Sequence, residues 1–213
     1  MSTYASPYTG ERATGAIFGR VMSLVGIAIA FLAVGAVVGR DVALGTAQAL
    51  GFVAIAMLLA QSFVAPLRRG GLGLTWLFAL ALILGVSLGP VLQSYATTDP
   101  DAVIQAAGAT ALTTLAMGAW GLATSADLSR WLRPLSFVML GLFVIGLLLL
   151  LFGAAGNPLF SLVVIVVSAA LLVVDFNYVR NRAQDDDVIW LATGIFVSIV
   201  NLFISFLNLF GRS

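Results

Sequence analysis

Seven apolar stretches, separated by short polar segments, constrain this chain more than any other feature of its sequence. A helix needs about 20 apolar residues to cross the hydrocarbon core of a bilayer, and each stretch is close to that length. Because backbone polar groups in lipid must be satisfied within the chain, the sequence predicts an all-α integral membrane protein, a seven-transmembrane-helix bundle. The predicted spans are 21–38, 42–65, 72–92, 103–122, 135–152, 159–178 and 188–210.

The placement of the basic residues predicts the orientation of the bundle. All ten are Arg, and with the N-terminus inside, eight fall in inner segments and only Arg40 and Arg212 in outer ones. The inner ones are Arg12, Arg20, Arg68, Arg69, Arg130, Arg133, Arg180 and Arg182. Cytosolic loops of membrane proteins carry an excess of basic residues. We therefore expect a cytosolic N-terminus, a flexible cytosolic tail over residues 1–20, and a membrane domain over residues 21–213.

The residue types that are absent exclude several classes of function. The chain has no Cys and no His, which excludes disulfides, thiolate nucleophiles, imidazole bases and nearly all zinc and copper sites. Its net charge of +1 argues against a nucleic-acid partner. Aspartyl hydrolysis needs two carboxylates, and only one acidic residue is expected inside a span. The sequence thus predicts neither an enzyme nor a bound cofactor.

Gly85, Ser87 and Gly89 match the G-x-S-x-G pattern of serine hydrolases. That motif needs a strand-to-helix turn and a His partner, and neither is expected here. Small residues four apart let helices approach closely in lipid, so we expect Gly85 and Gly89 to form a packing face. The same expectation applies to Gly15 with Gly19 and to Gly35 with Gly39.

The candidate functional residue is Asp175, the one acidic residue placed inside a predicted span. A carboxylate in a membrane helix is costly and is a functional candidate by default. Asp175 precedes Arg180 by five residues, about 7.5 Å along a helix axis, so it could instead be a structural anchor near the cytosolic interface. Its charge partners would then be Arg180, Arg68 and Arg69. The polar residues around it favour the functional interpretation.

Polar residues recur at helical spacing in the last two spans. Ser161, Ser168 and Asp175 are seven residues apart and therefore share one helix face. In the last span a second stripe falls within an arc of about 80°; its members are Gly194, Ser198, Asn201, Ser205 and Asn208. Such a stripe must face protein or a wet cavity. The two stripes either hydrogen-bond helices together or line a polar path with Asp175.

Four segments carry a family resemblance. They are residues 85–92 (GVSLGPVL), residues 110–129 with the DLS turn that begins at Asp127, the helix of Asp175, and residues 201–211 (NLFISFLNLFG). In these segments the chain resembles the Bax inhibitor-1 family, also called the transmembrane Bax inhibitor motif family, as a divergent bacterial-type member. The resemblance extends in order over all seven predicted spans. It implies a bundle with the last helix near the centre, in the bacterial plasma membrane.

The resemblance also implies a proton-sensitive calcium leak across the membrane. In the family this leak is associated with a pair of aspartates, one in each of the last two helices. Asp175 matches the first, whereas Ser198 occupies the position of the second. Two close carboxylates share a proton and titrate as a coupled pair, which a carboxylate and a hydroxyl do not. We therefore expect Asp175 to act as a gate residue and the pH sensor to be weakened or altered.

Two functions remain as hypotheses. The leading one is a passive cation leak along Asp175, Ser168, Ser198, Asn201 and Ser205, with calcium as the ion. One carboxylate and neutral oxygens would hold Ca²⁺ only weakly, which suits a conduit and defines no firm metal site. The alternative is a non-conducting protein that modulates a membrane protease or stress-response complex. Its partners would be other membrane proteins, in addition to the lipid bilayer.

Overall fold

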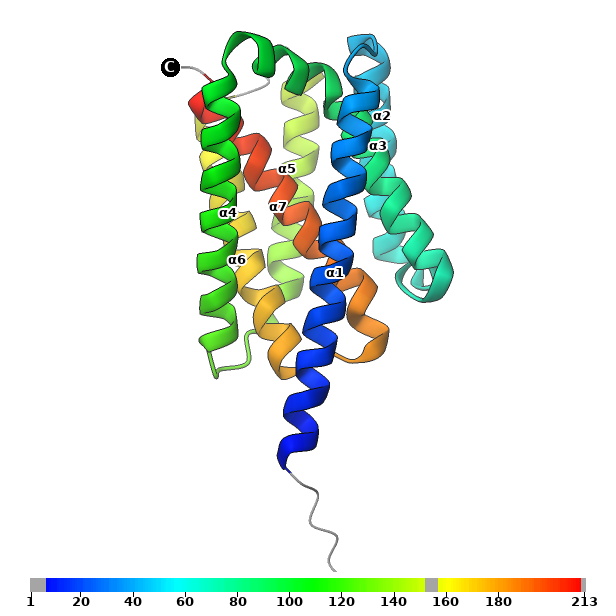
Figure 1. The fold of residues 1–213 in the computed structure, drawn as a ribbon, viewed down its shortest axis with the longest axis vertical. Coiled ribbons are helices and arrows are strands. Elements are labelled where there is room, and N and C mark those ends of the chain that lie inside the picture. The colour runs from blue at the N-terminus through cyan, green and yellow to red at the C-terminus, as the bar shows by residue number, and fades with distance from the viewer. Residues whose placement is uncertain (1–6, 152–156, 212–213) are drawn as a thin grey trace, which may run out of the picture.

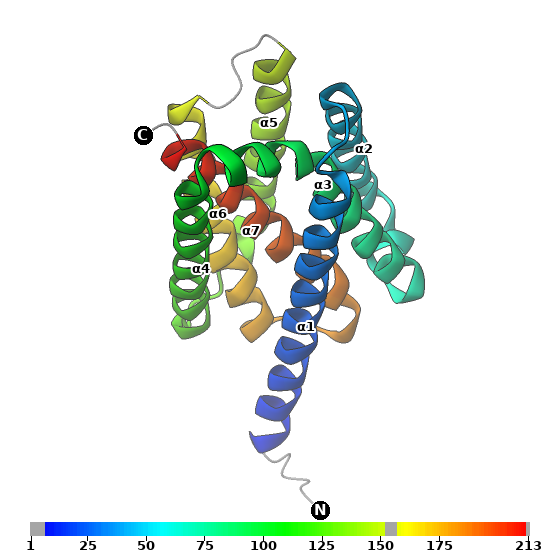
Figure 2. The same ribbon diagram turned by 45° about the horizontal axis from the view of Figure 1, so that its top comes forward.

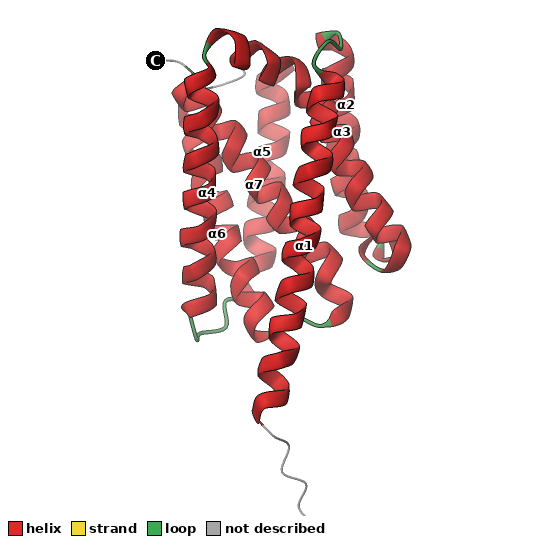
Figure 3. Cartoon of the chain, in the orientation of Figure 1, coloured by secondary structure: helices red, strands yellow, loops and turns green. Residues whose placement is uncertain are grey.

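The computed structural model describes residues 7–151 and 157–211, and every regular element in this part of the chain is helical. The long helices are α1 (Pro7–Gly39), α2 (Leu44–Phe63), α3 (Gly70–Thr98), α4 (Pro100–Ala123), α5 (Leu132–Leu151), α6 (Pro158–Asn181) and α7 (Val188–Phe210). Short 3₁₀ helices precede three of them: η1 (Ala65–Arg68), η2 (Ser129–Trp131) and η3 (Asp185–Asp187). Figures 1 and 3 show a single bundle of helices. Among the described residues seven helices are long and apolar enough to cross a membrane, as predicted.

The first helix begins earlier than the sequence predicts. α1 starts at Pro7 rather than near residue 21, and its first turns project beyond the other helices (Figure 1). Proline suits the first turn of a helix because its φ is already helical and its missing N–H needs no partner there. Residues 7–20 of the predicted flexible tail are therefore helical. Residues 1–6 and Arg212 lie outside the described residues, as does residue 152 at the end of the fifth predicted span.

α1 and α3 pack closely through glycines. A Cβ atom at Gly85 would overlap the carbonyl oxygen of Leu32, and one at Gly35 would overlap that of Leu82. Gly89 and Gly39 face each other in the same way, because a Cβ at Gly89 would lie 2.5 Å from the carbonyl carbon of Gly39. These four glycines let the two backbones touch, which is the small-residue packing expected in lipid.

Two other predictions about small residues have different outcomes, one for Ser87 and one for Gly15 with Gly19. Ser87 donates a hydrogen bond to the carbonyl of Leu84 in its own helix at 2.9 Å, so the G-x-S-x-G pattern belongs to a packing face, as predicted. Around Gly15 and Gly19, in contrast, no heavy atom lies within 4 Å of an added Cβ. The packing prediction for that pair is wrong, because this part of α1 lies towards the helix end that projects from the bundle.

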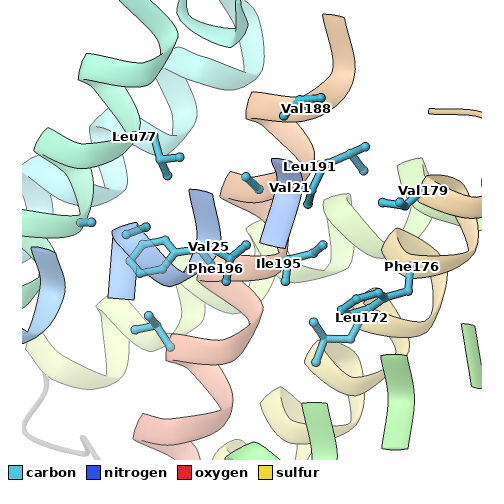
Figure 4. Close-up of a cluster of buried hydrophobic side chains, with 14 of the residues drawn as sticks. Val21, Val25, Leu77, Leu172, Phe176, Val179, Val188, Leu191, Ile195 and Phe196 are labelled. Atoms are coloured by element: carbon cyan, nitrogen blue, oxygen red, sulfur yellow. The ribbon is translucent and has the colours of Figure 1, made fainter. Parts of the chain in front are cut away.

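α7 lies near the centre of the bundle, as the resemblance implies. Twelve of its 23 residues are buried and ten of 24 in α6, against six of 29 in α3. It packs against α6, α4 and α1, and it crosses the middle of the bundle in Figure 2. Phe196 and Ile195, opposite its polar stripe, are fully buried in a core with Val25 and Leu77 (Figure 4). The face of α7 opposite its polar stripe is therefore covered by protein.

Ion pairs join the connections at one end of the bundle. Arg20 pairs with Asp185 at 2.6 Å, Arg69 with Asp186 at 3.1 Å, and Arg182 with Asp127 at 2.5 Å. We call this the arginine-rich end; it comprises the α2–α3, α4–α5 and α6–α7 connections and the neighbouring part of α1. These pairs are exposed to solvent, which weakens them, so they mark which connections lie side by side and contribute little to the stability of the fold. The positive-inside rule predicts that this end is cytosolic.

Candidate functional site

A cavity of about 670 Å³ lies between α2 and α5, with α6 and α7 forming its remaining walls. Its lining on α6 runs from Leu171 to Tyr178, and its lining on α7 from Trp190 to Asn201. Asn201 lies about 20 Å along the axis of α7 from its start. No described residue of α7 beyond Asn201 lines this cavity. The cavity therefore extends from the arginine-rich end to the middle of the bundle and not to the opposite end.

Asp175 lies in the wall of this cavity and is only 3% exposed. Its carboxyl group lies against Gly194 of α7, where an added Cβ would be 3.4 Å from Oδ2. In the described part of the chain the carboxyl group makes no hydrogen bond or ion pair. A buried carboxylate without a partner is costly, so this arrangement does not serve the stability of the fold.

The three arginines predicted as charge partners of Asp175 have other partners. Arg180 donates to the carbonyl of Leu122, Arg69 pairs with Asp186 at 3.1 Å, and Arg68 Nε donates to the carbonyl of Gln61 at 2.7 Å. Each lies at a helix end, where a free carbonyl or a loop aspartate is within reach. Of the three, only Arg68 lines the cavity. Among the described residues Asp175 therefore forms no ion pair that would make it a structural anchor.

The predicted polar path divides into two groups. Asp175, Ser198 and Asn201 line the same cavity. Ser205 is buried but lies further along α7, outside the cavity lining. Ser168 is also outside it, and its Oγ is buried without a hydrogen-bond partner among the described residues. The division follows from the depth of the cavity, which on α6 ends at Leu171.

Polar residues that the sequence did not single out complete the cavity. Gln61, at the end of α2, is 5% exposed and donates to Thr193 Oγ1 at 3.1 Å and to the carbonyl of Leu67 at 3.3 Å. From α5, Met139 Sδ accepts from Asn201 Nδ2 at 3.6 Å. A lone amide in an apolar helix is a signal that could have drawn attention to Gln61. Nothing in the local sequence marks Met139.

Asn177, two residues after Asp175, holds the α4–α5 connection against α6. It is fully buried; Oδ1 accepts from the amide of Leu128 at 2.9 Å. Its Nδ2 donates to the carbonyls of Thr124 at 2.9 Å and Ala126 at 3.0 Å. These bonds satisfy partly buried backbone groups of an irregular segment. They therefore position the helix that carries Asp175.

Asp127 supports the same connection from the solvent side. Its carboxyl accepts a hydrogen bond from the amide of Ser129 at 2.9 Å and pairs with Arg182 at 2.5 Å. The backbone hydrogen bond, followed by the side-chain hydrogen bonds with Ser129 and Arg182, lowers the pKa of Asp127 to about 2. The group therefore stays charged throughout the physiological range.

Most of the chain matches known proteins. A family model described as "Inhibitor of apoptosis-promoting Bax1" matches residues 15–213. An uncharacterised protein of Pseudomonas aeruginosa, PA2604, is 32% identical over 155 residues, which cover 68% of this chain and 66% of that protein. An uncharacterised membrane protein of Vibrio cholerae is 28% identical over 145 residues, covering 65% and 63%. The chain thus spans just under two thirds of the length of these relatives. The family match extends over all seven membrane-spanning helices, and the chain belongs to the Bax inhibitor-1 family of multi-pass membrane proteins.

Proposed function

We propose that this protein is a passive cation leak whose ion path begins in the cavity at Asp175. The observation that carries the proposal is a carboxyl group buried in a cavity wall with no hydrogen bond or ion pair among the described residues. Intramembrane carboxylates that face a cavity mark ion pathways. A cation entering from the arginine-rich end would find its counter-charge at Asp175.

The chemistry of the cavity wall favours a hard cation. The Asp175 carboxylate, the Ser198 hydroxyl and the Asn201 amide supply oxygen atoms, the ligand type that Ca²⁺ prefers. Tight calcium sites use six to eight such ligands, and these three side chains offer fewer. An ion would therefore bind weakly and leave readily, as conduction requires.

In this proposal the described conformation is a closed state of the path. The cavity lining on α7 stops at Asn201, and the next residue, Leu202, is fully buried. The polar stripe continues past it through Ser205 and Asn208. We propose that opening moves α7 relative to its neighbours, so that these residues extend the path to the other side of the membrane.

Control of the leak by pH would differ from that of family members with two aspartates. The resemblance places Ser198 at the position of the second aspartate, and Ser198 lines the same cavity as Asp175. A single carboxylate cannot form a coupled pair. We propose that the leak therefore responds less steeply to pH, over a range set by Asp175 alone.

Calcium flux into proteoliposomes tests the proposal. The wild type is compared with Asp175→Asn, which removes the charge and keeps the shape, and with Asp101→Asn, a matched control in the exposed first turn of α4. Flux should fall in Asp175→Asn and remain in Asp101→Asn. Equal flux of all three proteins at every pH would remove Asp175 from the mechanism, and absence of flux from the wild type would reject the leak.

The projecting part of α1 favours a second candidate function. Its first turns extend beyond the bundle at the predicted cytosolic end (Figure 1), where they offer a helix surface to another protein. A non-conducting modulator of a membrane protease or stress-response complex would use such a surface. Affinity purification from native membranes distinguishes the two functions, because a stoichiometric partner together with no ion flux would favour the modulator.

A further inference from the structure

The cavity has a mouth on the surface of the bundle between α2 and α5. α2 packs mainly against α3 and η1, whereas α5 packs mainly against α6 and η2. Phe63 at the end of α2 and Phe137 in α5 both line the cavity, yet they are 80% and 71% exposed. Side chains that belong to a cavity wall and to the outer surface mark its opening. In a membrane-spanning bundle, an opening between two helices faces lipid.

Two arginines without acidic partners lie beside this mouth. Arg133 makes no hydrogen bond or ion pair within the described residues. Arg68 makes one hydrogen bond there, which its Nε donates to the carbonyl of Gln61. Both line the cavity. Other arginines of this end are neutralised, since Arg20, Arg69 and Arg182 each pair with an aspartate. The mouth therefore carries two arginines that no aspartate neutralises among the described residues, at the arginine-rich end of α2 and α5.

The cavity wall beyond the arginines is largely apolar. Its apolar lining includes Leu58 and Leu59 of α2 and Leu140 and Phe143 of α5. From Arg133 to Phe143 this wall extends about 15 Å along the axis of α5. A volume of about 670 Å³ is typical of cavities that hold a ligand. A ligand with an anionic group would match the arginines at the mouth, and its hydrocarbon chain would match the apolar wall.

We propose that the cavity binds an anionic phospholipid, which enters from the bilayer between α2 and α5. Its phosphate would bind Arg68 and Arg133, because guanidinium groups form charge-assisted hydrogen bonds with phosphate. One acyl chain would lie on Leu58 and Leu140 and reach toward Asp175. Basic sites between transmembrane helices at the cytosolic side suit anionic headgroups. A soluble anion would gain nothing from the apolar wall or from a mouth that faces lipid.

A lipid in this position would also regulate the ion path. Its acyl chain would occupy the space beside Asp175, so that lipid and cation would compete for the cavity. This consequence rests on the proposed leak, whereas the lipid site itself does not. A binding measurement without ions therefore tests the site independently of the leak.

Native mass spectrometry of the full chain in detergent provides that measurement. Phosphatidylglycerol and phosphatidylcholine with identical acyl chains are compared on the wild type, on Arg68→Gln with Arg133→Gln, and on the control Arg130→Gln. Arg130 belongs to the same end but does not line the cavity. The wild type and the control should retain phosphatidylglycerol preferentially. The preference should fall about fivefold for each cavity arginine removed.

Three results would overturn the lipid site. They are equal retention of the two lipids by the wild type, an unchanged preference in the double variant, and displacement of phosphatidylglycerol by inorganic phosphate. Because Arg68 also binds the end of α2, Arg68→Lys serves as a second variant that keeps the charge, and it should keep the preference. Loss of the preference in Arg68→Lys together with retained folding, measured by size-exclusion chromatography, would equally reject the role of charge.

Discussion

Gly194 of α7 lies directly against the carboxyl group of Asp175 in α6, and a Cβ atom at position 194 would be 3.4 Å from Oδ2. The absence of a side chain at Gly194 lets the carboxyl group lie between the two helices and still reach the cavity that both of them line. The most buried pair of helices in the bundle thus contains the one intramembrane acidic group predicted from the sequence. The proposed ion path and the packing of α6 on α7 therefore both involve this contact.

Substitution of Gly194 should change calcium flux through the proposed leak, because a side chain at position 194 moves the carboxyl group of Asp175. Gly194→Ala places Cβ at ordinary van der Waals distance and should leave calcium flux nearly unchanged. Gly194→Val adds a Cβ that carries two methyl groups, which displace the carboxylate, and flux should fall toward the level of Asp175→Asn. The control is Gly108→Val, since no atom lies within 4 Å of a Cβ there. Full flux through Gly194→Val would contradict the proposed position of the path.

A second carboxylate at position 198 should give the calcium flux a coupled pH response. Ser198 lines the cavity with Asp175, and two neighbouring carboxylates share a proton. Calcium flux through Ser198→Asp should therefore depend more steeply on pH than flux through the wild type. Ser198→Asn is the control, because its side chain is of similar size and does not titrate. Identical pH profiles of the two variants would show that positions 175 and 198 do not interact.

Gly85→Ala should destabilise the contact between α1 and α3. The added methyl group would overlap the carbonyl oxygen of Leu32, and overpacking typically costs about 1–3 kcal/mol. The control is Gly26→Ala in α1, where no atom lies within 4 Å of the new Cβ. Thermal unfolding in detergent should show a lower midpoint for Gly85→Ala alone. Equal unfolding midpoints of the two variants would contradict the close packing of α1 on α3 at Gly85.

Loss of the Asn177 amide should loosen the α4–α5 connection. Asn177→Asp keeps an acceptor for the amide of Leu128 but removes the donors to Thr124 and Ala126. These carbonyls are partly buried, and a typical lost hydrogen bond costs about 0.5–1.5 kcal/mol. Proteolysis within residues 124–128 should accelerate in Asn177→Asp and not in Asn208→Ala, a control in the last helix. An unchanged cleavage rate would contradict the anchoring role.

Acidification should weaken the same connection through Asp127. Its hydrogen bonds with Ser129 and Arg182 lower the pKa from 3.8 to about 2. Because the folded-state pKa lies below the unfolded value, the stabilising contribution is complete above about pH 4 and is lost as the pH falls through the folded-state value. The wild type should therefore lose more thermal stability between about pH 5 and pH 2 than Asp127→Asn. Parallel losses in both proteins would contradict this assignment.

Much of the architecture could be predicted because membrane helices are specified locally. A helix in lipid satisfies its own backbone, so the length of an apolar run is enough to predict a span. The start of α1 was missed because residues 7–20 are polar enough to lack that signal, although they continue the same helix. Asp175 was recognised for a similar reason, since a carboxylate is conspicuous in an apolar run.

The surroundings of Asp175 were not predictable in the same way. The sequence by itself determined the helices, the polar stripe of α7 and the glycine face of α3, all of which depend on spacing within one segment. Only the tertiary structure decided that Asp175 lies beside Gly194, that Arg180 binds Leu122 instead, and that Arg68 and Arg133 share one cavity mouth. These relationships join helices far apart in the chain, and they depend on how side chains of different helices fit together.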